Sequence, residues 1–564
     1  MSLKKLILVV AIITLIVITV IKFWHRDVKS IFYDDFTENV NEQALTLVLH
    51  GLVQSKNIPP LKHYTITWKN TAIWFDHKAL EKEVLNNNLL LSVETWSKDS
   101  FFSSSTDNVL QKTLEGQFDS RIEALGRILS KTNKMVLVRW NPEMEVPVKK
   151  FPWQQQSPLL YIKAFQYFSL RLKKVAANAK IIWAPSGYPG DTEYFPGTNF
   201  VDLASITIKS VSEDSLPTGN PNTIPPEELL KQKLHRMRLL GKDVLVLVSK
   251  GTLLNNFQKS ILQNVQSNIR STEYTINSQD KNVNANSRMP LRAALNVGLY
   301  DPTERLVADP KVSVEHIFID WGQIEDGTFE KKFAEITARK HRAIITLEPW
   351  RSQISGPDSN VLISLSNGRY DPQIKQLYAV LSKATSTVYL RFAHEMEIPI
   401  HRYAWQSQDP VTYINAYRYF MKFFDARAGN IRRVWGPAGD RGSIDFWPGD
   451  DVVDYISIAI YGLPDKNISD HRKQESFEDI FNRKIYRMRF LTKPIFITEF
   501  GVKGPESFQS AWLQAAAKVI KDNRFVFGVC YFNLYDNPKV WGKDMDAPDW
   551  SITKATFDAF CNDL

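Results

Sequence analysis

The chain reads RFAHEMEIPIHRYAWQSQDPVTYINAYRYF over residues 391–420, and a diverged copy of this stretch lies earlier in the sequence. Residues 139–168 read RWNPEMEVPVKKFPWQQQSPLLYIKAFQYF, and 14 of the 30 positions are identical at a constant offset of 252 residues. The same offset matches Trp183 to Trp435, and a nearly equal one matches Trp68 to Trp321. Copies of about 250 residues have the size of whole domains, so the sequence predicts a duplicated domain.

Short apolar runs rich in β-branched residues alternate with longer helical patterns in the second copy. We expect eight strands there, at residues 293–299, 314–320, 343–347, 388–392, 431–435, 453–460, 494–498 and 526–532. Nearly continuous apolar strands separated by helices indicate a parallel sheet covered on both faces, and eight such units predict a (β/α)8 barrel. A doubly wound open sheet is the alternative, but no Gly-rich phosphate turn follows any of these strands.

The expected organisation is an α/β protein with two tandem TIM-type (β/α)8 barrels. The first barrel is assigned to residues 29–270 and is expected to be degenerate or incomplete, because an eighth strand is hard to find after Gly251. Residues 271–289 (STEYTINSQDKNVNANSRM) are polar and rich in Asn and Ser, which is typical of a linker. The second barrel is assigned to residues 290–564.

The N-terminal segment contains a run of 16 residues without charge, at residues 6–21 (LILVVAIITLIVITVI). Lys4 and Lys5 precede this run, and Trp24 follows it as an interfacial residue. The following residues KFWHRD offer no cleavage site of small residues, which disfavours the alternative of a cleaved signal peptide. We expect residues 1–28 to form one transmembrane signal anchor, with both barrels on the extracytoplasmic side of the cell membrane.

The composition excludes several classes of protein. With 44% hydrophobic and 23% charged residues in a chain of 564, the sequence is typical of a globular protein with large cores. Two cysteines exclude a disulfide scaffold and a Cys-rich metal site. The net charge of +9 is mild and no run of five basic residues occurs, which disfavours a nucleic-acid partner. We expect no cofactor and no metal, and the sequence leaves the oligomeric state open.

Candidate catalytic residues follow the strands of the second copy, where barrel active sites lie. Glu395 comes after the fourth expected strand and Glu499 after the seventh, so the two carboxyl groups can face each other across a bound substrate. Glycoside cleavage needs one protonated and one ionised carboxyl group, and aromatic rings at the mouth provide flat faces for sugars. The candidate substrate-binding residues are Arg391, His394, Trp405, Tyr461, Trp321 and Trp350. Glu348 has a counterpart in Glu94, which favours a structural role for it slightly.

Four segments of the second copy occur in a characteristic order. They are RFAHEM at 391–396, WGP at 435–437, WPGDD at 447–451 and KPIFITEFG at 493–501. Together they resemble glycoside hydrolase family 26, a retaining family of barrel enzymes. The resemblance implies that Glu395 is the general acid/base and Glu499 the nucleophile. It also implies that Arg391 and His394 position the acid/base, that Tyr461 hydrogen-bonds near the nucleophile, and that Trp405 forms part of a sugar platform.

The resemblance implies a retaining endo-glycosidase that hydrolyses β-linkages in a polysaccharide. Glu397 stands where mannan-cleaving members of the family have Asn, so mixed-linkage β-glucan or an exopolysaccharide fits better than β-mannan. One alternative is a non-catalytic polysaccharide-binding or scaffold protein of exopolysaccharide synthesis or secretion. The other is a transglycosylase that uses the same residues.

The first copy lacks part of this chemistry. Glu143 matches Glu395, but Pro142 replaces His394, and Ser249 or Val248 stands where the second copy has Glu499. A retaining mechanism without its nucleophile loses most of its rate, so we expect the first copy to be inactive. Saccharide binding through Trp96, Trp153 and Trp183 and a purely structural role both remain open for it.

Overall fold

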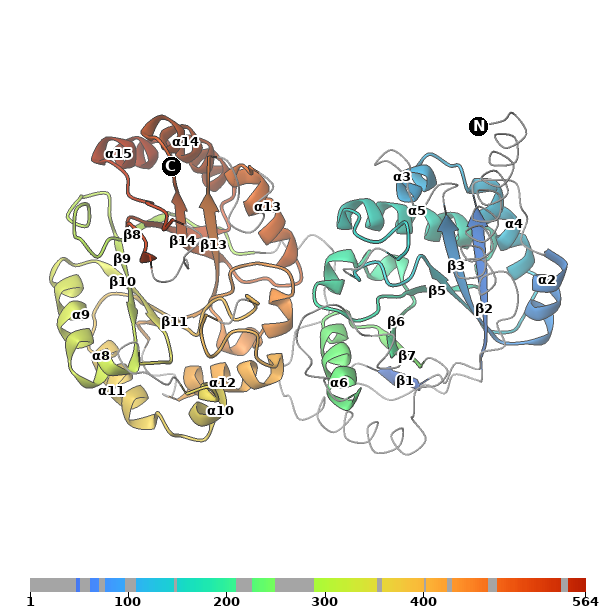
Figure 1. Ribbon diagram of the computed structural model, residues 1–564, viewed down its shortest axis with the longest axis horizontal. Helices are drawn as coiled ribbons and strands as arrows, with labels where there is room; N and C mark the ends of the chain where they lie inside the picture. Colours follow the sequence, from blue (N-terminus) through green and yellow to red (C-terminus); the bar gives the residue numbers. More distant parts are fainter. Residues whose placement is uncertain are drawn as a thin grey trace, which may run out of the picture.

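The computed structural model describes the chain in twelve segments. They are residues 47–50, 61–69, 77–96, 108–146, 150–208, 226–248, 289–351, 358–399, 402–423, 429–464, 474–538 and 546–564. These residues form two domains that lie side by side, each built on a mainly parallel β-sheet with helices outside it (Figure 1). The expected anchor at residues 1–28 lies outside the described residues, and so does the expected linker except Met289. Among the described helices, none has the length and apolarity to cross a membrane.

The first domain contains seven strands, five α-helices and two short 3-10 helices within the described residues. They are β1 (Leu47–His50), β2 (Lys62–Lys69), α2 (His77–Asn86), β3 (Leu89–Trp96), α3 (Val109–Leu114), α4 (Asp119–Leu129), β4 (Val136–Trp140), α5 (Pro158–Val175), β5 (Lys180–Trp183), η1 (Asp191–Tyr194), η2 (Thr198–Phe200), β6 (Leu203–Ile208), α6 (Pro226–Met237) and β7 (Asp243–Val248).

The first sheet is open in the described part of the chain. Its strand order is β1-β7-β6-β5-β4-β3-β2, and strands β2 to β7 run parallel. Strand β1 pairs antiparallel with β7, with Leu47 opposite Val246. The described residues include no strand that joins β1 to β2, so the expectation of an incomplete first barrel is confirmed for this part of the chain.

The second domain contains the eight strands that the sequence predicts, with eight α-helices and two 3-10 helices among the described residues. They are β8 (Asn296–Tyr300), β9 (Val314–Ile319), α8 (Trp321–Glu325), α9 (Thr328–Ala338), β10 (Arg342–Leu347), α10 (Val361–Ser366), α11 (Asp371–Leu381), β11 (Val388–Phe392), α12 (Pro410–Lys422), β12 (Ile431–Trp435), η4 (Ser443–Phe446), η5 (Asp450–Val452), β13 (Tyr455–Gly462), α13 (Phe477–Arg487), β14 (Ile495–Val502), α14 (Glu506–Asp522), β15 (Val526–Phe532) and α15 (Lys554–Asp563).

These eight strands close into a parallel barrel in sequence order, because β15 pairs with β8 and β8 pairs with β9. One end of the barrel interior is filled by apolar side chains, namely Val314, Ile344, Tyr389, Val434, Phe496 and Cys530. A second and larger apolar layer packs between the strands and the helices. The polar side chains Arg391 and Thr498 lie further along their strands and are also fully buried. The predicted (β/α)8 fold is therefore confirmed, with its polar interior near the carboxyl ends of the strands.

The duplicated stretch forms the same strand–turn–helix unit in both domains. Strands β4 and β11 each lead into a turn, and the following helices α5 and α12 each begin with a proline, Pro158 and Pro410. Proline suits the first helical position, because it lacks the N–H that would remain unpaired there and its φ is already helical. Asp409 caps α12 by accepting a hydrogen bond from the Thr412 amide at 2.9 Å.

The two domains contact each other through two reciprocal ion pairs, to each of which one domain contributes an arginine and the other a carboxylate. Arg236 on α6 donates from Nε to Oδ2 of Asp445 on η4 at 2.7 Å, and Arg487 on α13 donates from Nε to Oε1 of Glu193 on η1 at 3.1 Å. Arg236 matches Arg487 in the repeat, and Glu193 matches Asp445. Each copy thus uses the same two elements against the other, as in an isologous dimer.

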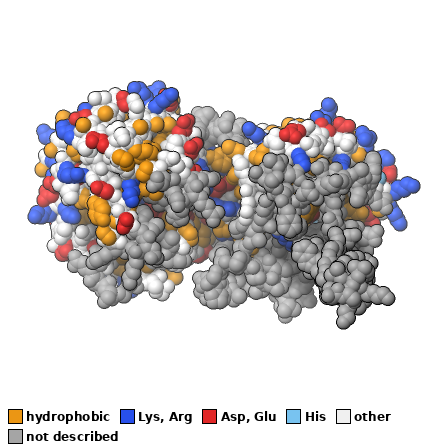
Figure 2. Space-filling model, turned by 45° about the horizontal axis from the view of Figure 1, so that its top comes forward, with side chains coloured by type: hydrophobic (Ala, Val, Ile, Leu, Met, Phe, Trp, Pro, Cys, Tyr) orange, Lys and Arg blue, Asp and Glu red, His pale blue; other side chains and the backbone are white. Residues whose placement is uncertain are grey.

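Charged side chains of both signs are scattered over the face of the molecule that Figure 2 draws. Figure 2 shows Lys and Arg side chains interspersed with Asp and Glu over the face drawn. The net charge of +9 is therefore not gathered into one basic patch on this face.

We predict that Asp445→Ala destabilises the docked domains by about 3–5 kcal/mol, because it leaves the buried Arg236 guanidinium without its carboxylate partner. The side chains of Arg236 and Asp445 are only 8% and 3% exposed. Unfolding by heat and by urea measures the effect. Glu330→Ala is the control, since it removes an exposed pair with Lys383 and should change stability by less than about 0.5 kcal/mol. A loss with Asp445→Ala no larger than that of the control contradicts the prediction.

Candidate active site

Strand ends of the second barrel bring together the residues that the sequence proposed as catalytic. Arg391 lies on β11, Glu395 in the turn after it, Tyr461 on β13 and Glu499 on β14. Arg391 is fully buried and Glu499 is 5% exposed, whereas Glu395 and Tyr461 are partly exposed. The four residues come from strands four, six and seven of the barrel, so they converge only in the folded domain.

Both carboxylate oxygens of Glu499 are held by neighbouring side chains. The Arg391 guanidinium forms an ion pair with Oε1, and the Tyr461 hydroxyl donates a hydrogen bond to Oε2 at 3.1 Å. A buried carboxylate is stable as an anion only when it is paired and hydrogen-bonded. Glu499 is therefore held in one orientation by a guanidinium and a hydroxyl group.

The Arg391 side chain reaches Glu499 by passing over Gly436, at the end of β12. A Cβ atom at residue 436 would collide with Nε, Cγ and Cδ of Arg391. Glycine is therefore required there by close approach of a side chain. The first copy has Ala184 at the matching position, fully buried.

Glu395 sits on a strained turn. Its φ is +53° and that of Ala393 is +46°, values that residues other than glycine rarely adopt. The turn is held by the Glu395 amide, which donates to the Gly436 carbonyl at 2.8 Å. In the first copy Asn141 and Glu143 have φ values of +43° and +60°, so the turn belongs to the duplicated architecture.

The environment of Glu395 favours its protonated form. Burial and the negative charge of Glu499 raise the pKa of Glu395 to about 8. A carboxyl group with this pKa carries a proton at neutral pH, while Glu499 is bound to a guanidinium. A carboxyl group with a raised pKa beside a carboxylate that is paired with a guanidinium is suited to acid/base and nucleophilic roles.

His394 lies beside this pair in a neutral state. Burial and the charge of Arg391 hold the pKa of His394 well below its usual range. Its Nε2 is 3.9 Å from Oε1 of Glu348, and its ring packs against the Phe318 ring with centroids 5.5 Å apart. His394 therefore shapes the wall of the site as an uncharged ring.

Glu348 is a third carboxyl group near the mouth of the barrel. The Trp350 indole donates to Oε2 of Glu348 at 3.1 Å, and burial raises the pKa of Glu348 to about 7. In the first copy Trp96 donates to Glu94 at 3.2 Å in the same way. The same indole-to-carboxyl hydrogen bond thus occurs in both copies, which agrees with the structural role that the sequence slightly favours for Glu348.

His316 is a neighbour of the site that the sequence analysis missed. Its Nδ1 lies 3.1 Å from the Thr498 carbonyl, directly before Glu499, and its Nε2 lies 2.8 Å from the Thr346 hydroxyl. The histidine occurs within β9, where the strand sequence VEHIFI gives no sign that its side chain points into the barrel.

Two of the expected sugar-binding tryptophans have no free ring face. Trp405 is fully buried and stacks on Tyr403 with ring centroids 4.4 Å apart, while Trp321 is fully buried and stacks on Tyr370 at 4.8 Å. The expectation that they stack on sugars is corrected for this reason, and both act in packing. Trp350 remains partly exposed and is retained as a candidate.

The tryptophans of the first copy show the same division. Trp153 and Trp183 are fully buried, so neither offers a face to a saccharide. Trp96 is partly exposed at the end of β3. Of the three tryptophans considered for the first domain, Trp96 alone keeps a role in sugar binding open.

Glu397 is part of the barrel framework. Its Oε1 accepts hydrogen bonds from the Gly439 amide at 2.9 Å and from the Ser443 hydroxyl at 2.8 Å. Glu145 accepts from the Gly187 amide at 2.8 Å in the first copy. Among the described residues, no group of three or more His, Cys, Asp or Glu side chains is arranged to hold a metal ion.

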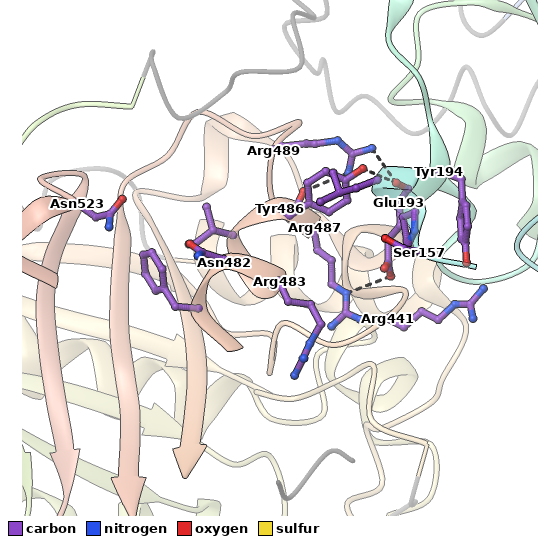
Figure 3. Close-up of a pocket in the computed structure, with 14 residues that line it drawn as sticks. Ser157, Glu193, Tyr194, Arg441, Asn482, Arg483, Tyr486, Arg487, Arg489 and Asn523 are labelled. Atoms are coloured by element: carbon purple, nitrogen blue, oxygen red, sulfur yellow. Dashed lines mark hydrogen bonds and ion pairs between the residues drawn. The ribbon is translucent and has the colours of Figure 1, made fainter. Parts of the chain in front are cut away.

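A pocket of about 740 Å³ lies at the junction of the two domains (Figure 3). Arginines line it, but each has protein partners: Arg483 pairs with Glu475, and Arg489 donates to the Thr192 carbonyl at 2.6 Å. Neither Glu395 nor Glu499 lines this pocket. We therefore assign it to domain docking and place the candidate active site at the barrel mouth.

Comparison with known proteins finds glycoside hydrolases. No family model matches the chain. Endoglucanase H of Acetivibrio thermocellus is 24% identical over 258 residues, which cover 43% of this chain and 26% of that protein. The β-1,3-xylanase TXYA of a Vibrio species is 23% identical over 214 residues, covering 34% of this chain and 45% of that protein. The chain thus spans less than half the length of these curated relatives.

Comparison with solved structures also finds glycoside hydrolases. GH26C from Muricauda sp. MAR_2010_75 aligns with a TM-score of 0.36 and 13% identity over 50% of this chain and 86% of that one. The endo-1,4-β-D-mannanase of Thermotoga petrophila aligns with a TM-score of 0.33 and 10% identity over 48% of this chain and 99% of that one.

We predict that Gly436→Ala displaces Arg391 and destabilises the second barrel by about 1–3 kcal/mol, the usual range for overpacking. Thermal unfolding measures this change. Gly429→Ala is the matched control, because nothing lies within 4 Å of a Cβ added there. If the Gly436→Ala protein is as stable as the Gly429→Ala control, the Arg391 side chain does not require a glycine at residue 436.

Proposed function

We propose that the second barrel is a retaining endo-β-glycosidase, similar to glycoside hydrolase family 26, that hydrolyses a polysaccharide. Glu395 acts as general acid/base and Glu499 as nucleophile. The observation that carries this proposal is that the two carboxyl groups have different surroundings. Arg391 and Tyr461 bind the two carboxylate oxygens of Glu499, whereas burial and the charge of Glu499 raise the pKa of Glu395 to about 8.

The proposed reaction proceeds in two displacements. In the first, Glu499 forms a bond to the anomeric carbon while the bond to the leaving oxygen breaks, and Glu395 gives its proton to that oxygen. Arg391 and Tyr461 hold the nucleophile in place for the attack. In the second, the Glu395 carboxylate takes a proton from water, the water oxygen attacks the anomeric carbon, and Glu499 leaves as a carboxylate.

A β-linked glucan or xylan is the proposed class of substrate. The support is that the relatives are an endoglucanase and a β-1,3-xylanase, together with the partly exposed ring of Trp350 near the mouth. We further propose that the apolar run at residues 6–21 tethers the chain to the cell membrane with both domains outside the cytoplasm.

We predict that Glu499→Ala lowers kcat at least about 1000-fold, because the covalent step loses its nucleophile. The full chain is incubated with β-1,3-xylan, mixed-linkage β-glucan, cellulose and mannan, and new reducing ends are counted. Glu335→Gln, an exposed glutamate on α9, is the control and keeps full activity. If the native chain shortens none of these polymers beyond the Glu499→Ala background, the hydrolase proposal is wrong.

The pH profile of kcat/KM tests the role of Glu395. Because the pKa of Glu395 is raised to about 8, the general acid is protonated below that pH and loses its proton above it. Activity on a polysaccharide therefore falls as the pH rises through about 8. An aryl glycoside with a good leaving group needs no protonation, so its glycosylation step stays flat over the same range. A basic limb that is equal for both substrates contradicts the assignment.

A further inference from the structure

Arg139 in the first domain is a buried guanidinium without a partner. It lies on β4 opposite Ser92 of β3, just as Arg391 lies on β11 opposite Thr346 of β10. Arg139 is 5% exposed, and its Nε is buried with no hydrogen bond. Among the residues that the structure describes, Arg139 has no counterpart of the ion pair that Arg391 forms with Glu499.

Two substitutions in the first copy explain the loss of the partner. Ala184 stands at the position that matches Gly436. A Cβ at residue 436 would collide with the Arg391 side chain, so we infer that the Ala184 Cβ keeps Arg139 from reaching across the first sheet in the same way. Strand β7 has the sequence DVLVLV, and its register places Leu247 beside Thr207, the counterpart of Ala459 that pairs with Glu499. The first domain therefore retains the cation but offers no acid on β7 to neutralise it.

Neighbouring groups compensate this charge only in part. The charges of Glu143 and Glu94 act on Arg139 and favour its protonated form, while burial lowers the pKa of the guanidinium. Burial also raises the pKa of Glu94 to about 7, so much of its negative charge is absent at neutral pH. A buried charge without a partner lowers the stability of a fold. Such a charge is therefore suited to pairing with a ligand of opposite charge.

Further polar groups on the same sheet also have no partner. The Ser205 and Thr207 hydroxyl oxygens on β6 are buried without a hydrogen bond. In the second barrel the counterpart of Ser205, Ser457, is satisfied by Thr498 at 2.5 Å. These hydroxyl groups lie on β6, two strands from the strand β4 that carries Arg139, and both groups can donate hydrogen bonds to an oxygen-rich ligand.

We propose that the first domain binds a carboxylated sugar, such as a glucuronic acid unit in a polysaccharide, with its carboxylate paired to Arg139. The planar guanidinium fits a carboxylate through two parallel hydrogen bonds. Trp96 lies at the end of β3, hydrogen-bonded to Glu94 and partly exposed, and its ring provides a surface for the sugar. This binding role is independent of the hydrolysis proposed for the second barrel.

Titration calorimetry on the full chain tests the proposal. The chain carries Glu395→Gln to prevent cleavage, and the probes are a glucuronate-containing tetrasaccharide, its neutral glucose counterpart and free glucuronate. The acidic tetrasaccharide is expected to bind at least tenfold more tightly than the neutral one, and Arg139→Met is expected to abolish this preference. If free glucuronate binds as tightly as the acidic tetrasaccharide, the contact with Arg139 is supported and the ligand is a small carboxylate. Equal affinity of Arg139→Met and its parent for the acidic probe overturns the proposal.

Thermal unfolding without ligand supplies a second readout that does not depend on any activity. Arg139→Met removes an unpaired buried charge, so the Tm is expected to stay equal or to rise. Arg391→Met is the matched control and is expected to lower the Tm, because it leaves Glu499 buried and unpaired. A fall in Tm for Arg139→Met as large as that for Arg391→Met would show that Arg139 is already paired. Failure of the second barrel to cleave any polymer would leave both readouts unaffected.

Discussion

The buried ion pair between Arg391 and Glu499 is the constraint on which the candidate active site depends. It joins strands four and seven of the barrel across the interior, and it requires Gly436 on the strand between them. The pair holds the Glu499 carboxylate near Glu395, and burial together with the charge of that carboxylate raises the pKa of Glu395 to about 8. The proposed acid/base and nucleophilic roles thus rest on one buried contact and on the barrel that fixes its geometry.

The two copies show which features survive when this contact is lost. The strained turn after the fourth barrel strand persists in both, at Glu143 and Glu395, and so does the indole that donates to the carbonyl before it. The reciprocal arginines at the domain junction also persist. Backbone architecture and domain docking are therefore preserved independently of the nucleophile, which indicates that the first domain is retained for its fold, its interface or a ligand of its own.

Sequence reasoning predicted the fold well because strand periodicity and the repeat are local signals. All eight strands of the second barrel lie where the apolar runs placed them, and Glu395 and Glu499 were found because strand ends converge in a barrel. Burial was less predictable: Trp321 and Trp405 read as sugar platforms, but tertiary packing covers both rings. His316 and the exchange between Arg236 and Asp445 depend on partners far away in the sequence, so no local pattern could indicate them.

Trapping the covalent intermediate tests the central claim most directly. A 2-deoxy-2-fluoro β-glycoside with an activated leaving group slows the second displacement, so the glycosyl-enzyme accumulates and mass spectrometry of its peptides can locate the sugar. The account predicts one added fluorosugar on Glu499, within the peptide of β14, and none in Glu499→Ala. A protein that cleaves polysaccharide but carries the label on another residue, or remains unlabelled, would contradict it.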